Sequence, residues 1–234
     1  MGLGWDTNRT ATSSPTTEEG AVLDYVADRW EQILLAGWQH FSLVVQCLVL
    51  ATVLAVGLAA LCYRSPRLSA AANTVSAVGL TIPSFALIGL LIAPLGFGVA
   101  PAVVVVTFFA ALPVLRNAVV GLAGVPPATV EAARGIGMGR AATFLRVELP
   151  MAWPVIHAGM RVSAQMVMGV AAVAAYVLGP GLGGFIFSGL SRLGGANSFA
   201  SVLTGVVAVV VVALVLDGLL VLLGRLTTSK GIRV

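Results

Sequence analysis

The sequence predicts an all-α integral membrane protein with five membrane-spanning helices and one long polar loop. Hydrophobic residues make up 59% of the 234 residues and charged residues only 9%, against roughly 25% charged residues in an ordinary soluble domain. Several long windows contain no Asp, Glu, Lys or Arg, and most basic residues lie between particular windows. The net charge of +4 is too small and too scattered to indicate a nucleic-acid partner.

The N-terminal 40 residues differ from the rest of the chain. Residues 1–20 are rich in Thr and Ser and lack the basic-then-apolar pattern of a cleaved signal peptide, so we expect a disordered external tail. Residues 21–40 carry apolar side chains at helical spacing, and Trp30 and Trp38 on that face indicate an amphipathic helix at the outer membrane interface. An N-terminal extension of the first span is the alternative for this segment.

Charge-free windows locate the spans, because an apolar helix needs roughly 20 residues to cross the bilayer. One window, 68–115, is too long for a single crossing, and Pro94, Gly96, Gly98 and Pro101 divide it. Pro83 is expected to kink the second span. The predicted spans are 41–63, 74–95, 99–116, 157–178 and 200–223, followed by a cytoplasmic tail at 226–234.

The basic residues predict the orientation. An external N-terminus leaves only Arg9, Arg29 and Arg192 outside, and the other ten basic residues inside. Cys47 and Cys62 lie about 22 Å apart along one predicted helix, so no internal disulfide forms between them, and the two cysteines do not make a metal centre.

The predicted cytoplasmic loop, 117–156, is the one long polar insertion. Pro126 and Pro127 suit the first turn of a short helix, and three glycines at 135, 137 and 139 end it. A second helical stretch, 140–148, is expected to stop at Leu149–Pro150. Two short helices joined by a glycine elbow predict a protruding structure, which we call the knob (residues 126–150).

The spacing within the knob resembles a known motif. Glu131-Ala132-Ala133, three residues, Gly137, nine residues and Val147-Glu148-Leu149-Pro150 resemble the EAA loop of binding-protein-dependent ABC transporter permeases. The pattern of that family is E-A-A, three residues, G, nine residues, I, any residue, L-P. Val147 in place of isoleucine is the sole departure.

The resemblance implies a type I ABC importer permease core over residues 41–225, in a prokaryotic plasma (inner) membrane. It implies that the knob forms coupling helices that dock on a cytoplasmic ABC ATPase dimer. The implied coupling residues are Glu131, Ala132, Ala133, Gly137, Met138, Phe144, Leu145, Leu149 and Pro150. The implied further partners are a second permease chain, identical or related, and an external substrate-binding protein.

No catalytic residue or cofactor is expected in this chain. The glycines near 135–139 lack the preceding strand and the Gly-Lys-Ser/Thr of a phosphate-binding loop. ATP and Mg are therefore expected on the separate ATPase.

Other stretches are similar to the permeases of osmoprotectant uptake, which carry glycine betaine, choline or carnitine. They include Trp38–Leu43, Asn73–Ser84, Leu178–Gly189 and Leu216–Gly218. Methionine- or amino-acid-type import is the alternative. Aromatic residues are only 7% of the chain and scattered, so no aromatic cage for a quaternary ammonium group is expected within the spans. Recognition is then expected to belong to the binding protein.

Polar groups at membrane depth are candidate functional residues. We expect Arg161 and Asp217 to form an ion pair, as a structural tie or as part of a gate. Phe185 and Phe187 are expected on one helix face, as an external gate. Candidates for lining the pathway, which helix-to-helix hydrogen bonds explain equally well, are Gln46, Pro83, Ser84, Ser163 and Gln165.

An ion-coupled secondary transporter would also have several apolar spans. Such a protein usually carries coupling-ion carboxylates or broken-helix repeats near the midplane, and Asp217 alone does not supply them. A membrane-embedded enzyme would need paired catalytic residues within the spans, and the sequence shows none.

Overall fold

The computed structural model describes residues 18–227, and these residues form only helices and their connections. Positions 1–17 of the expected tail at 1–20 lie outside the described residues. Positions 228–234 of the expected C-terminal tail also lie outside them. The elements are α1 (Glu18–Cys62), α2 (Pro66–Gly79), α3 (Ser84–Leu95), α4 (Val99–Ala123), α5 (Pro127–Gly135), α6 (Arg140–Thr143), a π-helical turn (Phe144–Glu148), α7 (Leu149–Ala174), a 3-10 turn (Ala175–Val177), α8 (Gly183–Leu190) and α9 (Ser198–Thr227).

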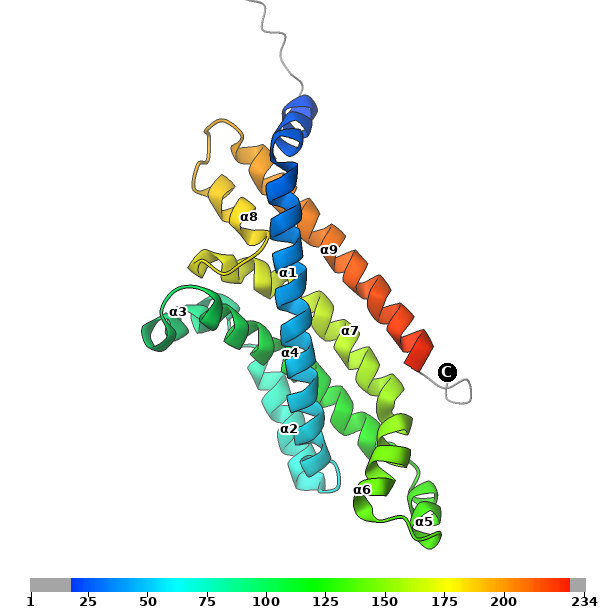
Figure 1. The fold of residues 1–234 in the computed structure, drawn as a ribbon. Helices are drawn as coiled ribbons and strands as arrows, with labels where there is room; N and C mark the ends of the chain where they lie inside the picture. The colour runs from blue at the N-terminus through cyan, green and yellow to red at the C-terminus, as the bar shows by residue number, and fades with distance from the viewer. Residues whose placement is uncertain (1–17, 228–234) are drawn as a thin grey trace, which may run out of the picture.

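Helix α1 is one unbroken helix of 45 residues, which runs the length of the molecule (Figure 1). At 1.5 Å per residue it is about 68 Å long, more than twice the hydrocarbon thickness of a bilayer. The expectation of a separate interfacial helix at 21–40 is wrong, and the alternative of an extended first span is the one observed. The segment contains no proline, so nothing interrupts its backbone hydrogen bonds.

The predicted second span, 74–95, is two helices. Helix α2 begins at Pro66, and α2 and α3 meet at an angle of 92°. Pro83 precedes the first residue of α3 and lacks the N–H that a continuous helix would need. The break lies where Pro83 predicts a kink, but it separates two helices and does not merely bend one.

Helices α4 and α7 form the centre of the bundle. Gly121 lies against Ala152, and Gly159 lies so close to Asn117 that an added Cβ would stand 2.6 Å from the Asn117 side chain. Small residues let two helices approach closely, which favours their packing in lipid, where no hydrophobic effect drives helices together. Both helices exceed their predicted spans, because α4 continues past 116 to Ala123 and α7 begins at Leu149.

The proline at position 150 does not end a helix. The π-helical turn directs the Leu149 N–H to the Phe144 carbonyl, and Pro150 falls in the first turn of α7, where a missing N–H costs little. The expected stop at Leu149–Pro150 is therefore wrong, and the second half of the knob continues directly into a span.

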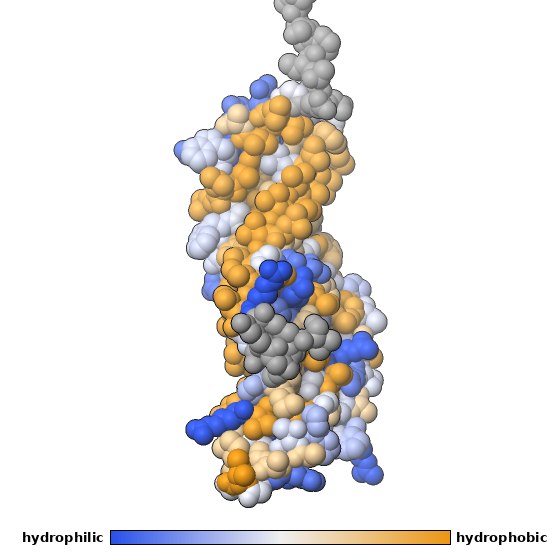
Figure 2. Space-filling model, turned by 90° about the vertical axis from the view of Figure 1, so that its right-hand side faces the viewer, coloured by the Kyte–Doolittle hydropathy of each residue, from blue (hydrophilic) through white to orange (hydrophobic). Residues whose placement is uncertain are grey.

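Helix α9 presents an almost uninterrupted apolar surface. Figure 2 shows this side of the molecule as a band of hydrophobic residues, with hydrophilic residues concentrated towards the knob end. Among the described residues, four helices are long and apolar enough to cross a bilayer, and the bent pair α2–α3 meets the same criterion when its two helices are taken together. The chain is a multi-pass membrane protein.

Candidate functional site

The knob protrudes from one end of the bundle (Figure 1). Helix α5 ends at Gly135, and Gly137 then adopts φ +88, a conformation that glycine reaches without steric cost. The Gly137 and Met138 N–H groups donate to the Arg134 and Ala133 carbonyls, which closes the end of α5. The polar loop proper begins after Ala123, so the predicted start at 117 is wrong.

The exposed surface of the knob is centred on the elbow. Ile136 is 82% exposed and Leu145 is 60% exposed, and both are apolar side chains with little cover from this chain. Glu131, Ala132 and Pro150 are also exposed, and Met138 and Leu149 are half-buried. The two remaining coupling candidates differ: Ala133 is buried, and Phe144 packs against Tyr63 with ring centroids 6.4 Å apart. Phe144 therefore holds the knob on the bundle, Ala133 is buried within the knob, and neither side chain is a free anchor.

Glu148 joins the knob to the end of α1. Its side chain is only 2% exposed and accepts hydrogen bonds from the Tyr63 hydroxyl and from Arg64 Nη2, the latter at 3.1 Å to Oε1. Arg64 Nε also donates to the Tyr63 hydroxyl at 2.6 Å. Burial, together with the hydrogen bond to Glu148 and its negative charge, raises the pKa of Tyr63 above its ordinary value. This cluster of Tyr63, Arg64 and Glu148 was not predicted, because the family pattern allows any residue at position 148.

Replacing Glu148 by alanine is expected to lower the free energy of unfolding by about 1–3 kcal/mol, since two donors lose a buried acceptor. Thermal unfolding of the purified chain in detergent measures the change. Glu131→Ala removes an exposed carboxylate from the same knob and is the matched control. Equal melting temperatures for the two variants would show that the buried cluster does not stabilise the knob.

Arg161 and Asp217 lie together within the spans. Arg161 Nε and Nη2 each donate to one Asp217 carboxylate oxygen at 2.9 Å, a bidentate pair between α7 and α9. Gln165 Nε2 donates to the same carboxylate at 3.3 Å. One helical turn away, His157 Nε2 lies 2.8 Å from the Leu220 carbonyl oxygen. The polar groups of α7 thus fasten α9 to the bundle.

The remaining pathway candidates are dispersed. Ser163 is completely buried and donates to the Ala110 carbonyl at 2.7 Å, so it ties α7 to α4 and does not line an open pathway. Gln46 is exposed and donates to Ser42 Oγ at 2.7 Å. Pro83 is exposed at the break before α3, and Ser84 is half-buried as the first residue of that helix.

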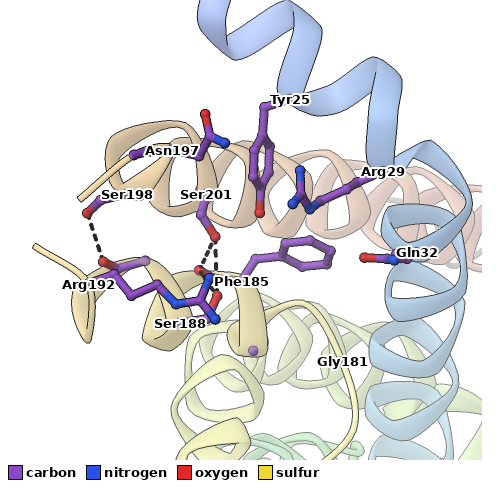
Figure 3. A pocket seen from close by; sticks show the side chains of 13 residues that line it. Tyr25, Arg29, Gln32, Gly181, Phe185, Ser188, Arg192, Asn197, Ser198 and Ser201 are labelled. Carbon is purple, nitrogen blue, oxygen red and sulfur yellow. Dashed lines mark hydrogen bonds between the residues drawn. The ribbon is translucent and has the colours of Figure 1, made fainter.

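A polar cavity of about 430 Å³ opens between α1, α8 and the start of α9, at the end of the bundle away from the knob (Figures 1 and 3). Arg29 reaches it from α1 and Arg192 from the residues after α8, and no acidic side chain lines it. Ser201 Oγ donates to the Phe185 carbonyl at 2.8 Å and thereby fixes α8 on α9. Two guanidinium groups, with no carboxylate among the described residues that line the cavity, favour a negatively charged group there.

Phe185 and Phe187 lie on different faces of α8. Phe185 lines the polar cavity, whereas the Phe187 ring contacts Tyr176 at a centroid distance of 5.4 Å. Residues two positions apart on an α-helix point in nearly opposite directions, so the expectation that both phenylalanines share one face is wrong.

Comparison with known proteins identifies the family. Residues 49–229 match the model of the binding-protein-dependent transport system inner membrane component. The chain belongs to this family.

Proteins that align with most of this permease are themselves named as transport permeases. It is 34% identical to the carnitine transport permease protein OpuCB of Listeria monocytogenes, over 91% of this chain and 96% of the relative. It is 37% identical to the osmoprotectant import permease protein OsmW of Salmonella typhimurium, over 91% and 99%. It is 31% identical to the choline transport system permease protein OpuBB of Bacillus subtilis, over 91% and 96%.

Solved structures share the permease fold. A chain of the MetNI methionine ABC transporter superposes with a TM-score of 0.71 at 19% identity, over 84% of this permease and 96% of that chain. A chain of an amino acid ABC transporter superposes with a TM-score of 0.63 at 18% identity, over 87% and 97%. The family match and the named relatives show that the permease is a transport subunit of an ABC importer, which works with ATPase and binding-protein partners.

Proposed function

We propose that this permease forms, with a second permease chain, the pathway by which an ABC importer takes up a small osmoprotectant with a trimethylammonium group, such as glycine betaine, choline or carnitine. The observation that carries the proposal is the protruding knob with its EAA spacing, in a chain whose relatives at 31–37% identity are named for carnitine, choline, glycine betaine or osmoprotectant transport. The methionine alternative is supported here by structures 19–20% identical to this chain, and that likeness concerns the fold alone.

The knob docks on a cytoplasmic ATPase dimer through Ile136 and Leu145, with Glu131 and Ala132 beside them. Closure of the ATPase then displaces the knob, and Glu148 transmits the displacement to α1 through Tyr63 and Arg64. ATP and Mg belong to the ATPase, and this chain carries out no catalysis itself. This arrangement requires an external N-terminus and a cytoplasmic C-terminus in a prokaryotic plasma membrane.

The external binding protein delivers the solute at the opposite end. There the cavity with Arg29 and Arg192 accepts a carboxylate of that protein, because it offers two cations and no acidic side chain.

Solute uptake tests the proposal directly. Cells that lack their own osmoprotectant importers receive this chain together with its ATPase and its binding protein. Accumulation of radiolabelled glycine betaine, choline or carnitine, without accumulation of methionine, is the expected result. Accumulation of methionine alone would overturn the assigned substrate class, and uptake that persists without the ATPase would overturn ATP-driven import.

A further inference from the structure

Three aromatic rings from separate parts of the chain form a row on the protein surface. Phe85 at the start of α3, Tyr176 in the 3-10 turn and Phe187 in α8 make up this aromatic row. The Phe85 and Tyr176 ring centroids are 4.9 Å apart with planes at 54°, and those of Tyr176 and Phe187 are 5.4 Å apart with planes at 62°. Phe85 is 51% exposed and Tyr176 is 55% exposed. No aromatic cage is expected within the spans from the sequence, and the scattered positions of these three residues give no sign that their rings meet.

The aromatic row lies between two breaks in the helical backbone. Residues 80–83 separate α2 from α3 immediately before Phe85. On the other side, Leu178 adopts φ +62 two residues after Tyr176, and Gly181 adopts φ +120 before α8 begins. The second break reaches from the polar cavity into the apolar part of the bundle, because Gly181 lines that cavity whereas Leu182, the next residue, shares an apolar groove with Val207 and Val211 of α9.

Broken backbone at membrane depth does not face lipid, since hydrocarbon cannot hydrogen-bond its free N–H and C=O groups. Such segments are found where protein covers them or where they line a water-filled cavity. Thr81 in the first break and Leu178 in the second are exposed in this chain, so this chain alone does not cover them. A water-filled pathway enclosed with a second permease chain satisfies this requirement and places the aromatic row on its wall.

We propose that the aromatic row is a weak binding site for the trimethylammonium group of the imported solute, on the wall of the translocation pathway. The inference rests on the proposed function and gives it a site within the spans. A cation over a ring face is attracted by the ring quadrupole. The rings of the row are tilted against one another and not stacked face to face, and Phe85 and Tyr176 are about half exposed, so their surfaces are accessible to a cation.

The surroundings of the aromatic row favour this cation over a small hydrated ion. The sequences of α3, the 3-10 turn and α8 contain no Asp, Glu, Lys or Arg, so the three elements that carry the rings bring no fixed charge of their own. A trimethylammonium group presents methyl groups to the rings and gives up little hydration. A weak site also suits a pathway, because a solute that binds tightly would not leave it.

Leucine substitutions test the site, because leucine keeps apolar bulk and removes the ring. The complete transporter, with its ATPase and binding protein, is reconstituted in vesicles with each of Phe85→Leu, Tyr176→Leu and Phe187→Leu. Uptake of a trimethylammonium solute at subsaturating concentration is expected to fall roughly 2- to 30-fold, the range that corresponds to one lost cation–π contact. Tyr176→Phe keeps the ring and is expected to retain uptake. Phe199→Leu removes an exposed ring from α9, outside the row, and is the matched control.

A binding measurement separates recognition from packing. The probes are choline and its neutral carbon analogue 3,3-dimethylbutan-1-ol, applied to the purified permease–ATPase complex without binding protein and detected by saturation-transfer NMR. Wild type is expected to bind the cation in preference to the alcohol. Equal binding of the two probes would overturn the inference even if the leucine variants fail to fold.

The two proposals fail in different ways. Leucine variants that transport as well as wild type would overturn the aromatic site and leave the proposed function intact. A wild-type transporter that imports no trimethylammonium solute at all would overturn the proposed substrate class.

Discussion

Replacing Asp217 by leucine is expected to destabilise the permease strongly, because Arg161 then has no anionic partner. Two nitrogen atoms of the Arg161 guanidinium donate to the Asp217 carboxylate at 2.9 Å, between α7 and α9. An unpaired charge at the centre of a span costs roughly 2.5–3.5 kcal/mol on insertion scales. We expect the free energy of unfolding to fall by about 2 kcal/mol. This is less than the full insertion cost, because the Arg161 side chain is 39% exposed in this chain and therefore stays partly solvated. Thermal unfolding in detergent and the yield of monodisperse protein measure the effect.

The double variant Arg161→Leu/Asp217→Leu is the control for charge. It removes both ions, so it is expected to recover most of the stability that the single variant loses. A double variant as unstable as Asp217→Leu would show that the pair stabilises the bundle by packing and not by neutralising a charge at membrane depth.

Replacing Gly137 by proline is expected to abolish transport while the protein still inserts into the membrane. Gly137 has φ +88, whereas proline fixes φ near −65°. Proline also lacks the N–H that donates to the Arg134 carbonyl at 2.9 Å at the end of α5. The elbow of the knob then changes direction and the exposed Ile136 beside it is misplaced. We expect uptake to fall at least about tenfold, the effect of roughly 1.4 kcal/mol of lost coupling. Radiolabelled uptake, normalised to the amount of permease in the membrane, is the measurement.

Gly137→Ala and Gly137→Asn provide graded controls. No atom lies within 4 Å of an added Cβ at this position, so alanine costs only backbone strain, and asparagine tolerates a positive φ better than alanine. Transport is expected to decline in the order Gly, Asn, Ala, Pro. Full transport by the proline variant would contradict a role for the elbow in coupling.

The approximate positions of the spans and the elbow of the knob could be predicted from the sequence. Each of these features depends on local composition or on a backbone conformation that one residue type favours. The Arg161–Asp217 pair was also predictable, since two opposite charges at similar depth have few other partners. By contrast, the break between α2 and α3 was underestimated, because Pro83 signals an interruption and says nothing of its angle. The helix continues past Pro150 because a π-helical turn precedes it, and no residue type in the sequence predicts such a turn.

Contacts between distant residues were the least predictable part of the candidate site. Phe85 and Tyr176 lie on elements that only the packing of α3 against α7 brings together, so neither spacing nor composition indicates the aromatic row. The link from Tyr63 to Glu148 is similar, because it joins the end of one span to the start of another. Glu148 lies within the motif, and a carboxylate between apolar residues there was the one available signal for a buried partner.

Photo-crosslinking from Ile136 tests the central claim most directly. A photoreactive amino acid replaces Ile136 at the tip of the knob, and the intact transporter is irradiated in its native membrane. The account predicts a covalent adduct between this permease and its ATPase, and no such adduct from position 193, where the equally exposed Leu193 lies in the connection between α8 and α9 at the opposite end. Adducts with the ATPase from position 193 and none from position 136 would contradict the account.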